Sequence, residues 1–256
     1  MMNYSMVDIT ISVVSHGQAS LINDLLHDID LHCHVISIEL ILTLNLEESL
    51  PFALDSFSFP IKLISNITPK GFGANHNQAF SHATGAYFCV LNPDVRFNTD
   101  PFAALLANLK EQSIGVVAPL VVSQHGAIEN SARKFPTPFK ILCKALGRCK
   151  HSDYVITDQV IQPDWIGGMF MLLPSKIFAQ VAGFDERYFL YYEDVDFCAR
   201  LRLLGYDIVL CPQAKVFHYA QRDSHDSFKY FVWHVRSMLR FFVSPVFWRV
   251  QFKKYL

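Results

Sequence analysis

Short apolar runs that alternate with helical segments constrain the fold of this chain most. Residues 9–14, 35–44, 61–65 and 86–91 are apolar stretches of strand length, and each is followed by polar residues. Between the first two, residues 21–29 carry apolar side chains at helical spacing. Strands that alternate with helices favour an α/β fold, in which a mostly parallel central sheet is flanked by helices.

Length and composition favour one large domain with a short extension. The chain has 256 residues and a hydrophobic content of 51%, which is enough for a substantial core. We expect residues 1–225 to form the domain and residues 226–256 to form a helical extension.

The formal net charge of -1 gives no reason to expect nucleic-acid binding, which usually needs a strongly basic face. The cysteines lack C-x-x-C spacing, and neither a secretory signal nor an apolar run of about 18 residues is recognisable, so we expect a cytoplasmic protein with reduced thiols.

The predicted extension is amphipathic and cationic. One helical stripe holds Phe228, Phe231, Val232, Val235, Leu239 and Phe242. From residue 227 to the end there are six basic residues and no acid, and Phe247, Trp248, Phe252 and Tyr255 follow a break at Ser244-Pro245 as candidate aromatic anchors. Two interpretations of residues 228–242 remain open: a helix in an anionic membrane interface, or a helix packed on the core of the domain. For the last turn of the extension, the membrane interpretation is favoured.

Polar residues that directly follow strands are candidates for ligand binding. In open α/β sheets, ligands bind beyond the carboxyl ends of the strands. His16, Asn45 and Asn66 occupy such positions, and Asp94 ends the motif Leu91-Asn-Pro-Asp94. A carboxylate there can hold Mg²⁺ or Mn²⁺ between two phosphates, and His218 is a candidate second metal ligand. The alternatives are ordinary turn formers and a structural histidine.

A glycine turn and an acidic segment complete the candidate site. The motif Lys70-Gly-Phe-Gly-Ala-Asn-His-Asn77 opens a helix whose free amides can meet an anionic group, or simply be capped. It matches neither a dinucleotide fingerprint nor a P-loop, which disfavours those enzyme classes. Glu193 and Asp194 stand at the start of a predicted helix that ends before Gly205. These acids either complement the helix dipole or supply a catalytic base. The aromatic residues that lead into them form a surface on which a sugar can stack: Tyr188, Phe189, Tyr191 and Tyr192. Residues 165–173 are predicted as one strand entered through Gly167 and Gly168, glycines that favour a bulge or close approach to a ligand.

The order of these motifs resembles glycosyltransferase family 2, with the GT-A fold, and most closely its bacterial rhamnosyltransferase branch. The resemblance extends from about residue 9 to residue 225. It is carried by Val13-Val-Ser-His-Gly17, Gly71-Phe-Gly-Ala-Asn-His-Asn77, Leu91-Asn-Pro-Asp94, Trp165-Ile-Gly-Gly168, residues 183–196 and His218-Tyr-Ala220, with further similarity at Arg133-Lys-Phe-Pro136 and Phe231-Val-Trp-His234.

The resemblance assigns roles to individual residues. Asp194 matches the general base, with Glu193 beside it, and Asp94 matches the surviving acid of a D-x-D metal motif whose first position holds Asn92. His218 would complete a Mg²⁺ or Mn²⁺ site. The nucleotide-sugar contacts would be Ser15, His16, Asn45, Gly71, Gly73, Asn77, Asn92 and Asp94, and the acceptor contacts Trp165, Gly167, Gly168, Tyr191 and Tyr192. Leu44-Asn45 departs from the more usual Asp-Asn pair.

The resemblance implies an inverting transfer of L-rhamnose from dTDP-rhamnose to N-acetylglucosaminyl-diphospho-polyprenol in O-antigen assembly, at the cytoplasmic face of the bacterial inner membrane. Two alternatives remain. A sugar-nucleotide nucleotidyltransferase needs a glycine-rich basic loop after the first strand, but residues 15–20 contain no basic residue except His16. A non-catalytic sugar-nucleotide-binding subunit is disfavoured by the intact Glu193-Asp194 pair.

Overall fold

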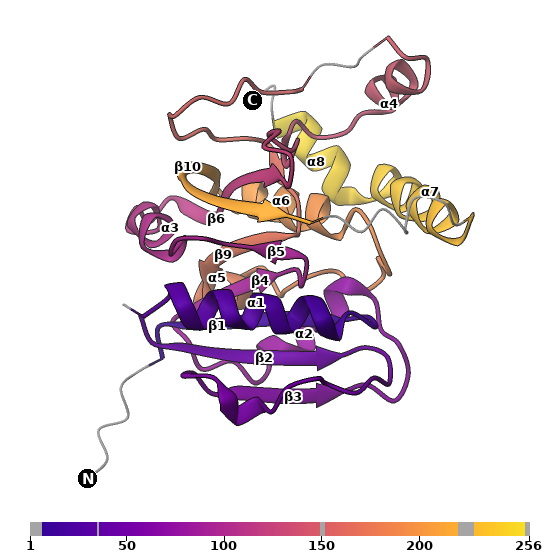
Figure 1. The fold of residues 1–256 in the computed structure, drawn as a ribbon. Coiled ribbons are helices and arrows are strands. Elements are labelled where there is room, and N and C mark those ends of the chain that lie inside the picture. The colour runs from indigo at the N-terminus through magenta and orange to yellow at the C-terminus, as the bar shows by residue number, and fades with distance from the viewer. Residues whose placement is uncertain (1–6, 35, 149–151, 220–227, 254–256) are drawn as a thin grey trace.

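The computed structural model describes residues 7–34, 36–148, 152–219 and 228–253 (Figure 1). The strands are β1 (Ile9–Ser15), β2 (Ile38–Leu44), β3 (Ile61–Ser65), β4 (Tyr87–Leu91), β5 (Val95–Arg96), β6 (Ile114–Ser123), β7 (Ala132–Arg133), β8 (Trp165–Ile166), β9 (Phe170–Pro174) and β10 (Asp207–His218). The helices are α1 (Ala19–His32), α2 (Phe72–Phe80), α3 (Phe102–Asn108), α4 (Pro138–Ala145), α5 (Ser175–Gln180), α6 (Glu193–Leu203), α7 (Phe228–Val243) and α8 (Pro245–Lys253), with a 3₁₀ turn, η1, at Leu54–Ser56.

An eight-stranded sheet forms the centre of the molecule. Its strand order is β3-β2-β1-β4-β9-β6-β10-β5. The pairs β3/β2, β2/β1, β1/β4 and β6/β10 are parallel, whereas β9 is antiparallel to both of its neighbours and β5 is antiparallel to β10. A separate two-stranded sheet pairs β7 with β8. The predicted α/β fold with a mostly parallel sheet is confirmed.

Helices cover both faces of this sheet, because its strands alternate two sets of buried side chains. On β4, Cys89 and Leu91 face the core shared with α1 and α3, whereas Phe88 and Val90 face the core shared with α2, α5 and α6. In Figure 1 the strands are stacked from β3 at the bottom to β6 and β10 in the upper half of the view. The carboxyl ends of β1, β2 and β4 therefore meet at one edge, as the sequence predicts.

Two elements differ from the sequence prediction. The single strand predicted for residues 165–173 is wrong: β8 and β9 belong to different sheets, and residues 167–169 carry the chain between them. In that link the amide of Gly167 donates to the carbonyl of Ser131, at 2.9 Å. The second difference is β6, a buried strand in the middle of the sheet that was not predicted.

The extension packs on the domain with one face and exposes another. Phe241, Phe247 and Val250 are buried in the core that contains α6, and the Ser237 hydroxyl donates to the Leu190 carbonyl, at 2.9 Å. The prediction that Phe247 is a free aromatic anchor is therefore wrong. The exposed apolar side chains of α7 and α8 are Phe228, Phe231, Val232, Leu239, Val243, Trp248 and Phe252. Tyr255 and the predicted boundary at 225/226 lie outside the described residues, so that boundary stays a prediction.

No helix in the described part of the chain is long and apolar enough to cross a membrane. The cysteines within that part, at positions 33, 89, 143, 198 and 211, are free thiols, as predicted.

Candidate active site

An asparagine cluster ties together the loops that follow β1, β2 and β3. Asn45 is buried, and its side-chain amide donates to His16 Nδ1 (3.1 Å) and to the Lys70 carbonyl (3.0 Å). Its oxygen accepts hydrogen bonds from the Lys70 amide (2.8 Å) and from Asn66 Nδ2 (2.9 Å). Ser15 is also buried and accepts a hydrogen bond from the Gln18 amide. Asn45 and Ser15 therefore shape this edge of the sheet, while the exposed His16 remains open to a ligand.

The predicted nucleotide-binding residues of α2 mainly hold this helix against residues 184–189. A Cβ on Gly71 would lie 2.6 Å from the Phe189 carbonyl oxygen, and one on Gly73 would lie 2.6 Å from Phe184 Cβ. Asn77 donates to the Phe184 carbonyl (2.9 Å) and accepts from the Phe184 amide (2.8 Å). The glycines thus permit close approach of two chain segments.

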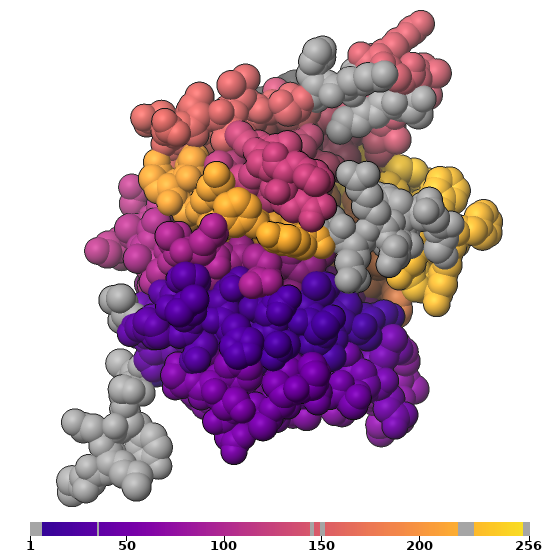
Figure 2. All heavy atoms as spheres, in the orientation of Figure 1, coloured from indigo at the N-terminus to yellow at the C-terminus, as the bar shows by residue number. Residues whose placement is uncertain are grey.

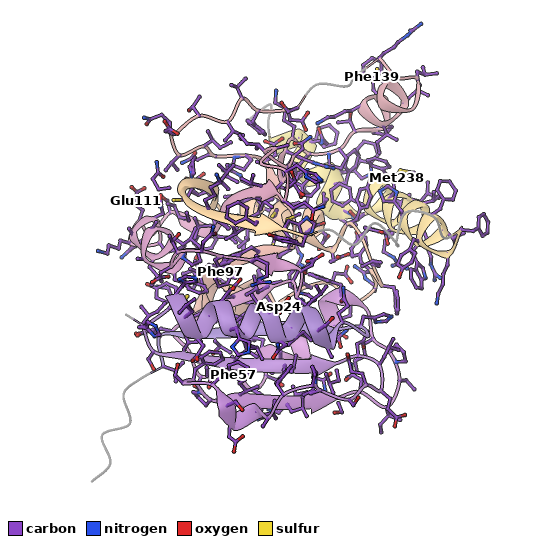
Figure 3. The ribbon with its side chains drawn as sticks, in the orientation of Figure 1. Asp24, Phe57, Phe97, Glu111, Phe139 and Met238 are labelled. Carbon is purple, nitrogen blue, oxygen red and sulfur yellow. The ribbon has the colours of Figure 1, made fainter. Side chains whose placement is uncertain are left out.

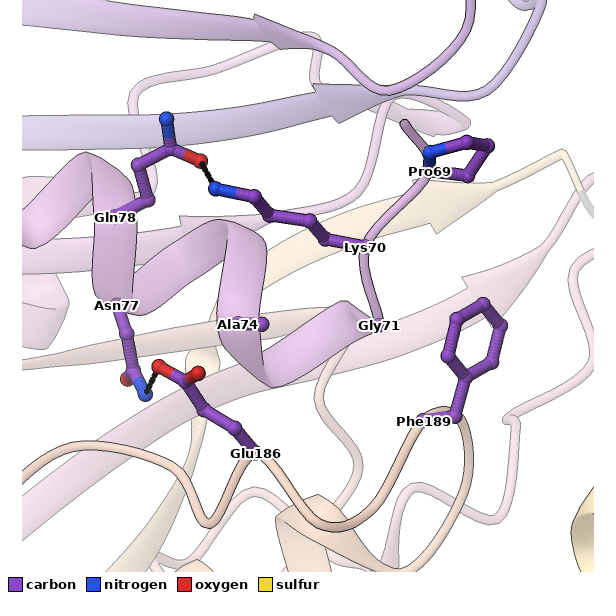
Figure 4. Close-up of a pocket in the computed structure, with 8 residues that line it drawn as sticks. All are labelled: Pro69, Lys70, Gly71, Ala74, Asn77, Gln78, Glu186 and Phe189. Atoms are coloured by element: carbon purple, nitrogen blue, oxygen red, sulfur yellow. Dashed lines mark hydrogen bonds between the residues drawn. The ribbon is translucent and has the colours of Figure 1, made fainter. Parts of the chain in front are cut away.

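A cavity of about 460 Å³ lies on the outer side of α2 (Figure 4). It is lined by Pro69, Lys70, Gly71, Ala74, Asn77, Gln78, Glu186 and Phe189. On the opposite side of α2, His76 is buried against Ser12, with Nδ1 2.8 Å from the Ser12 hydroxyl. The cavity includes Gly71 and Asn77 but none of the residues that directly follow β1, β2 or β4. Through Lys70, which is hydrogen-bonded to Asn45, it adjoins the edge described above.

Gly73 provides a stability prediction. We expect Gly73→Ala to destabilise the protein by about 1–3 kcal/mol, because its Cβ has to displace Phe184 in a packed core. The matched control is Gly167→Ala, whose Cβ would meet its nearest neighbour at an ordinary 3.4 Å. Urea unfolding of both variants measures the difference. Equal stability of the two variants would contradict this interpretation of the glycine turn.

Asp94 and His218 lie side by side because β5 pairs with the end of β10, with His218 opposite Val95. His218 Nε2 is 3.1 Å from Asp94 Oδ2, and His218 Nδ1 is 2.9 Å from Glu129 Oε2. Burial disfavours the charged imidazole, but the hydrogen bonds and charges of Asp94 and Glu129 outweigh it and raise the pKa of His218 to about 9. Glu129 was not predicted, and no motif in its own segment distinguishes it.

The Asp94–His218 pair fits a divalent cation. Carboxylate oxygen and imidazole nitrogen are ligands that Mn²⁺ and related ions accept. Asp94 Oδ1 is buried and has no hydrogen-bond partner in the described structure, so one oxygen remains available for a ligand. Within the described residues, no group of three or more histidine, cysteine or acidic side chains is arranged to hold a metal. The described residues thus offer two donors rather than a complete cage.

Glu193 and Asp194 open α6 after two tyrosines with left-handed backbone conformations, Tyr191 (φ 69°) and Tyr192 (φ 68°). Such strain in bulky residues is typical of functional sites. Asp194 accepts hydrogen bonds from the amides of Gly168 (3.2 Å) and Val195 (2.8 Å). Burial raises the pKa of Asp194, while these amide hydrogen bonds and the charge of Arg133 favour its carboxylate form.

Glu193 has a different environment from its neighbour. Its side chain is buried, and Oε2 has no hydrogen-bond partner among the described atoms. Burial and the charge of Asp194 raise the pKa of Glu193 well above its usual range. Glu193 therefore retains a proton more readily, whereas Asp194 is the acid that the backbone stabilises as a carboxylate.

The link between β8 and β9 connects the two acidic centres. The Gly168 amide donates to Asp194, and the Asn92 amide donates to the carbonyl of the next residue, Met169, at 2.9 Å. Asn92 is two residues from Asp94. Because Gly168 and Met169 are consecutive, Asp94 and Asp194 lie at the same end of the sheet.

Arg133 and Trp165 lie together, and the charge of Arg133 acts on Asp194. The Trp165 indole donates to the Lys134 carbonyl (3.1 Å), and the Arg133 guanidinium lies 5.5 Å from the Trp165 ring centroid. The rings of Tyr191 and Tyr192 pack beside His234 of α7, at 5.3 and 5.5 Å between centroids.

Two other aromatic side chains of residues 188–192 pack against the protein itself. Tyr188 is a core residue and offers no stacking surface, which corrects that part of the predicted sugar platform. Phe189 packs on Trp233, with 4.7 Å between ring centroids.

Comparisons with known proteins agree with this architecture. The chain is 31% identical over 185 residues to rhamnosyltransferase WbbL of Escherichia coli K12. The aligned region covers 67% of this chain and 69% of WbbL. It is 34% identical over 140 residues to the N-acetylglucosaminyl-diphospho-decaprenol L-rhamnosyltransferase of Mycobacterium tuberculosis. That alignment covers 51% of this chain and 46% of the mycobacterial protein. The chain thus spans about half the length of the mycobacterial relative.

Solved structures share the fold at low sequence identity. The chain superposes on GalNAc-T7 with UDP, GalNAc and Mn²⁺ with a TM-score of 0.65 at 15% identity, which covers 85% of this chain and 45% of that one. It also superposes on the mannosyltransferase PcManGT of Pyrobaculum calidifontis in complex with GDP-Man and Mn²⁺, with a TM-score of 0.62 at 16% identity. That superposition covers 93% of this chain and 65% of PcManGT. The family model of glycosyl transferase family 2 matches residues 44–173, about half of the chain. The chain therefore belongs to glycosyl transferase family 2 and has the GT-A fold.

Proposed function

We propose that this chain is an inverting glycosyltransferase that transfers L-rhamnose from dTDP-rhamnose to N-acetylglucosamine on a polyprenyl diphosphate. The observation that carries the proposal is the meeting of the Asp94–His218 pair and Asp194 beside one backbone link, in a member of a glycosyltransferase family. The names of the Escherichia coli and mycobacterial relatives support the choice of sugar and acceptor. We place the reaction in the assembly of O-antigen or another cell-surface polysaccharide.

In this mechanism Asp194 acts as the general base. It takes the proton from an acceptor hydroxyl while that oxygen forms a bond to the anomeric carbon of the donor. The bond between that carbon and the diphosphate oxygen breaks on the opposite face, so the configuration inverts and the nucleoside diphosphate leaves. The amides of Gly168 and Val195 orient the Asp194 carboxylate for this step.

Asp94 and His218 would hold Mg²⁺ or Mn²⁺. When bound, the cation would neutralise charge on the departing diphosphate, a Lewis-acid role. The protein's own contribution is orientation: Glu129 fixes the His218 imidazole through Nδ1 and leaves Nε2 directed at Asp94. Because a ligating imidazole must be unprotonated, metal binding at this pair competes with protons.

Glu129 can be tested independently of catalysis. We expect Glu129→Gln to weaken Mn²⁺ affinity by about 10–100-fold, as is typical when the partner of a ligating histidine is lost. The matched control is Glu111→Gln, an exposed site that Figure 3 shows on the side of the molecule away from Met238 of α7. Isothermal titration with Mn²⁺ measures both affinities. An unchanged affinity in Glu129→Gln would remove Glu129 from the metal site.

The proposed activity is tested by incubating the protein with a panel of nucleotide sugars, polyprenyl-diphospho-N-acetylglucosamine and Mg²⁺ or Mn²⁺. Mass spectrometry of the lipid product should show addition of one deoxyhexose from dTDP-rhamnose, with weaker transfer from other donors. Preferential transfer of another sugar would refute the donor assignment. Absence of transfer from every donor with both metals would overturn the proposal.

We also propose that α7 and α8 hold the enzyme at the cytoplasmic face of the inner membrane. The exposed apolar residues of these helices lie in a segment with six basic residues and no acid, which suits an anionic interface. Truncation at residue 244 would remove the buried Phe247 and Val250, so substitutions at exposed positions are the sharper test. We expect Trp248→Glu with Phe252→Glu to lower recovery with anionic liposomes in flotation. Recovery equal to that of the wild type would contradict a membrane role for this end.

A further inference from the structure

Helix α4 presents an apolar face to solvent although it lies outside the predicted extension. Phe139, Leu142 and Leu146 are 76%, 58% and 60% exposed. Their spacing of three and then four residues places them on one side of the helix and its last turn. Ile141 is partly buried on another side. Helix α4 therefore offers an apolar side outward.

The segment around α4 is strongly cationic. Residues 133–150 contain six basic residues, Arg133, Lys134, Lys140, Lys144, Arg148 and Lys150, and no acidic residue. Lys140 pairs with Asp153 at 2.5 Å, and Arg148 and Lys134 are exposed. Exposed apolar side chains among cations match a surface that is negatively charged at its headgroups and apolar beneath them.

This segment begins beside Asp194 of the candidate active site. Arg133 packs over Trp165, and its charge acts on Asp194 of α6 and His234 of α7. Five residues further on, α4 begins at Pro138. In Figure 1, α4 and α7 project from the same side of the molecule, and Figure 2 shows both segments at its right-hand edge. A flat surface that touches α7 is therefore also within reach of α4.

We propose that α4 is a second membrane-contacting element, which docks on an anionic lipid surface together with α7 and α8. The inference rests on the proposed function, because a lipid-linked acceptor has to reach Asp194 from a membrane. Contact on both α4 and the α7–α8 pair sets the tilt of the domain, so that the end of the sheet that carries Asp194 faces the lipid headgroups. A single amphipathic helix would leave this orientation free.

Flotation with vesicles tests the proposal without any sugar donor or acceptor. The full chain is mixed with vesicles of phosphatidylcholine alone or with vesicles that also contain phosphatidylglycerol. We expect Phe139→Glu with Leu142→Glu to lower partitioning to the anionic vesicles by about tenfold or more, because two apolar contacts are lost. The matched control is Leu31→Glu, an equally exposed leucine at the end of α1 that should partition like the wild type. Thermal unfolding of each variant verifies that the fold is retained.

The outcomes separate this inference from the proposed function. If the α4 variant partitions like Leu31→Glu, or if wild-type partitioning is the same with and without phosphatidylglycerol, α4 is not a membrane element, whatever the transferase activity. If the α4 substitutions instead abolish self-association in light scattering and leave vesicle binding intact, the face binds a second copy of the chain and the inference is overturned. If the proposal is correct, the α4 variant loses transfer to a vesicle-embedded acceptor but retains transfer to a water-soluble, short-chain acceptor.

Discussion

Asp194→Asn is expected to lower turnover by about 10²–10⁴-fold, the typical contribution of general-base assistance. An amide cannot take the proton of the acceptor hydroxyl, although it keeps nearly the shape of the carboxylate. Donor binding should survive, because the donor's diphosphate is assigned to the Asp94 side of the site. Steady-state kinetics with dTDP-rhamnose, together with donor affinity from calorimetry, separates the two effects.

Glu193→Gln is the matched control for this experiment. Burial and the charge of Asp194 raise the pKa of Glu193 well above its usual range, so a neutral amide resembles the protonated side chain already present. We expect its loss of turnover to be much smaller than that of Asp194→Asn. Near-normal transfer by Asp194→Asn would remove Asp194 from the mechanism, and a larger loss in Glu193→Gln would assign the base to Glu193 instead.

Asp94→Asn is expected to lower kcat/KM by at least about 10²-fold, because a metal Lewis acid contributes several kcal/mol and each 1.36 kcal/mol is a factor of ten. Unlike the Asp194 variant, it should also lose affinity for the donor in the presence of Mn²⁺, and high Mn²⁺ should recover part of the activity. The side chain of Asn92 cannot compensate, since it carries no charge.

The control for Asp94 is Asp55→Asn, which removes the same charge at an exposed position in η1. Titration of activity with Mn²⁺ gives an apparent metal affinity for each protein. A wild-type rate and wild-type metal dependence in Asp94→Asn would show that this carboxylate does not hold the cation.

Local patterns predicted the first half of the sheet well. β1, β3 and β4 begin and end within one residue of their predicted bounds, since each is an apolar run followed by a polar turn. β6 was missed because Pro119 lies in its middle, and proline argues against a central strand. The structure accommodates Pro119 where its partner β10 breaks register, between Cys211 and Lys215. Nothing in the sequence of one strand reveals an irregularity in its distant partner.

In the candidate site, too, residues marked by a local pattern were predicted, and residues that depend on a distant partner were missed. Asp94, His218 and Asp194 were found because each stands near the end of a strand or the start of a helix, positions that sequence patterns can indicate. Glu129 was missed because its relation to His218 joins residues 89 positions apart in an unremarkable loop. Gly73 matched a motif for ligand binding, but its lack of a side chain is required by Phe184, from a segment more than a hundred residues later. Close approach between distant segments depends on packing that a single sequence does not display.

The central claim is that Asp94, His218 and Asp194 form one donor site at the carboxyl ends of the strands. A crystal structure of the protein with dTDP-rhamnose, or a non-hydrolysable analogue, and Mn²⁺ tests it most directly. We predict the diphosphate and cation at Asp94 and His218, with the anomeric carbon facing the Asp194 carboxylate. A nucleotide sugar bound instead in the cavity between Lys70 and Phe189, on the outer side of α2, would contradict the claim.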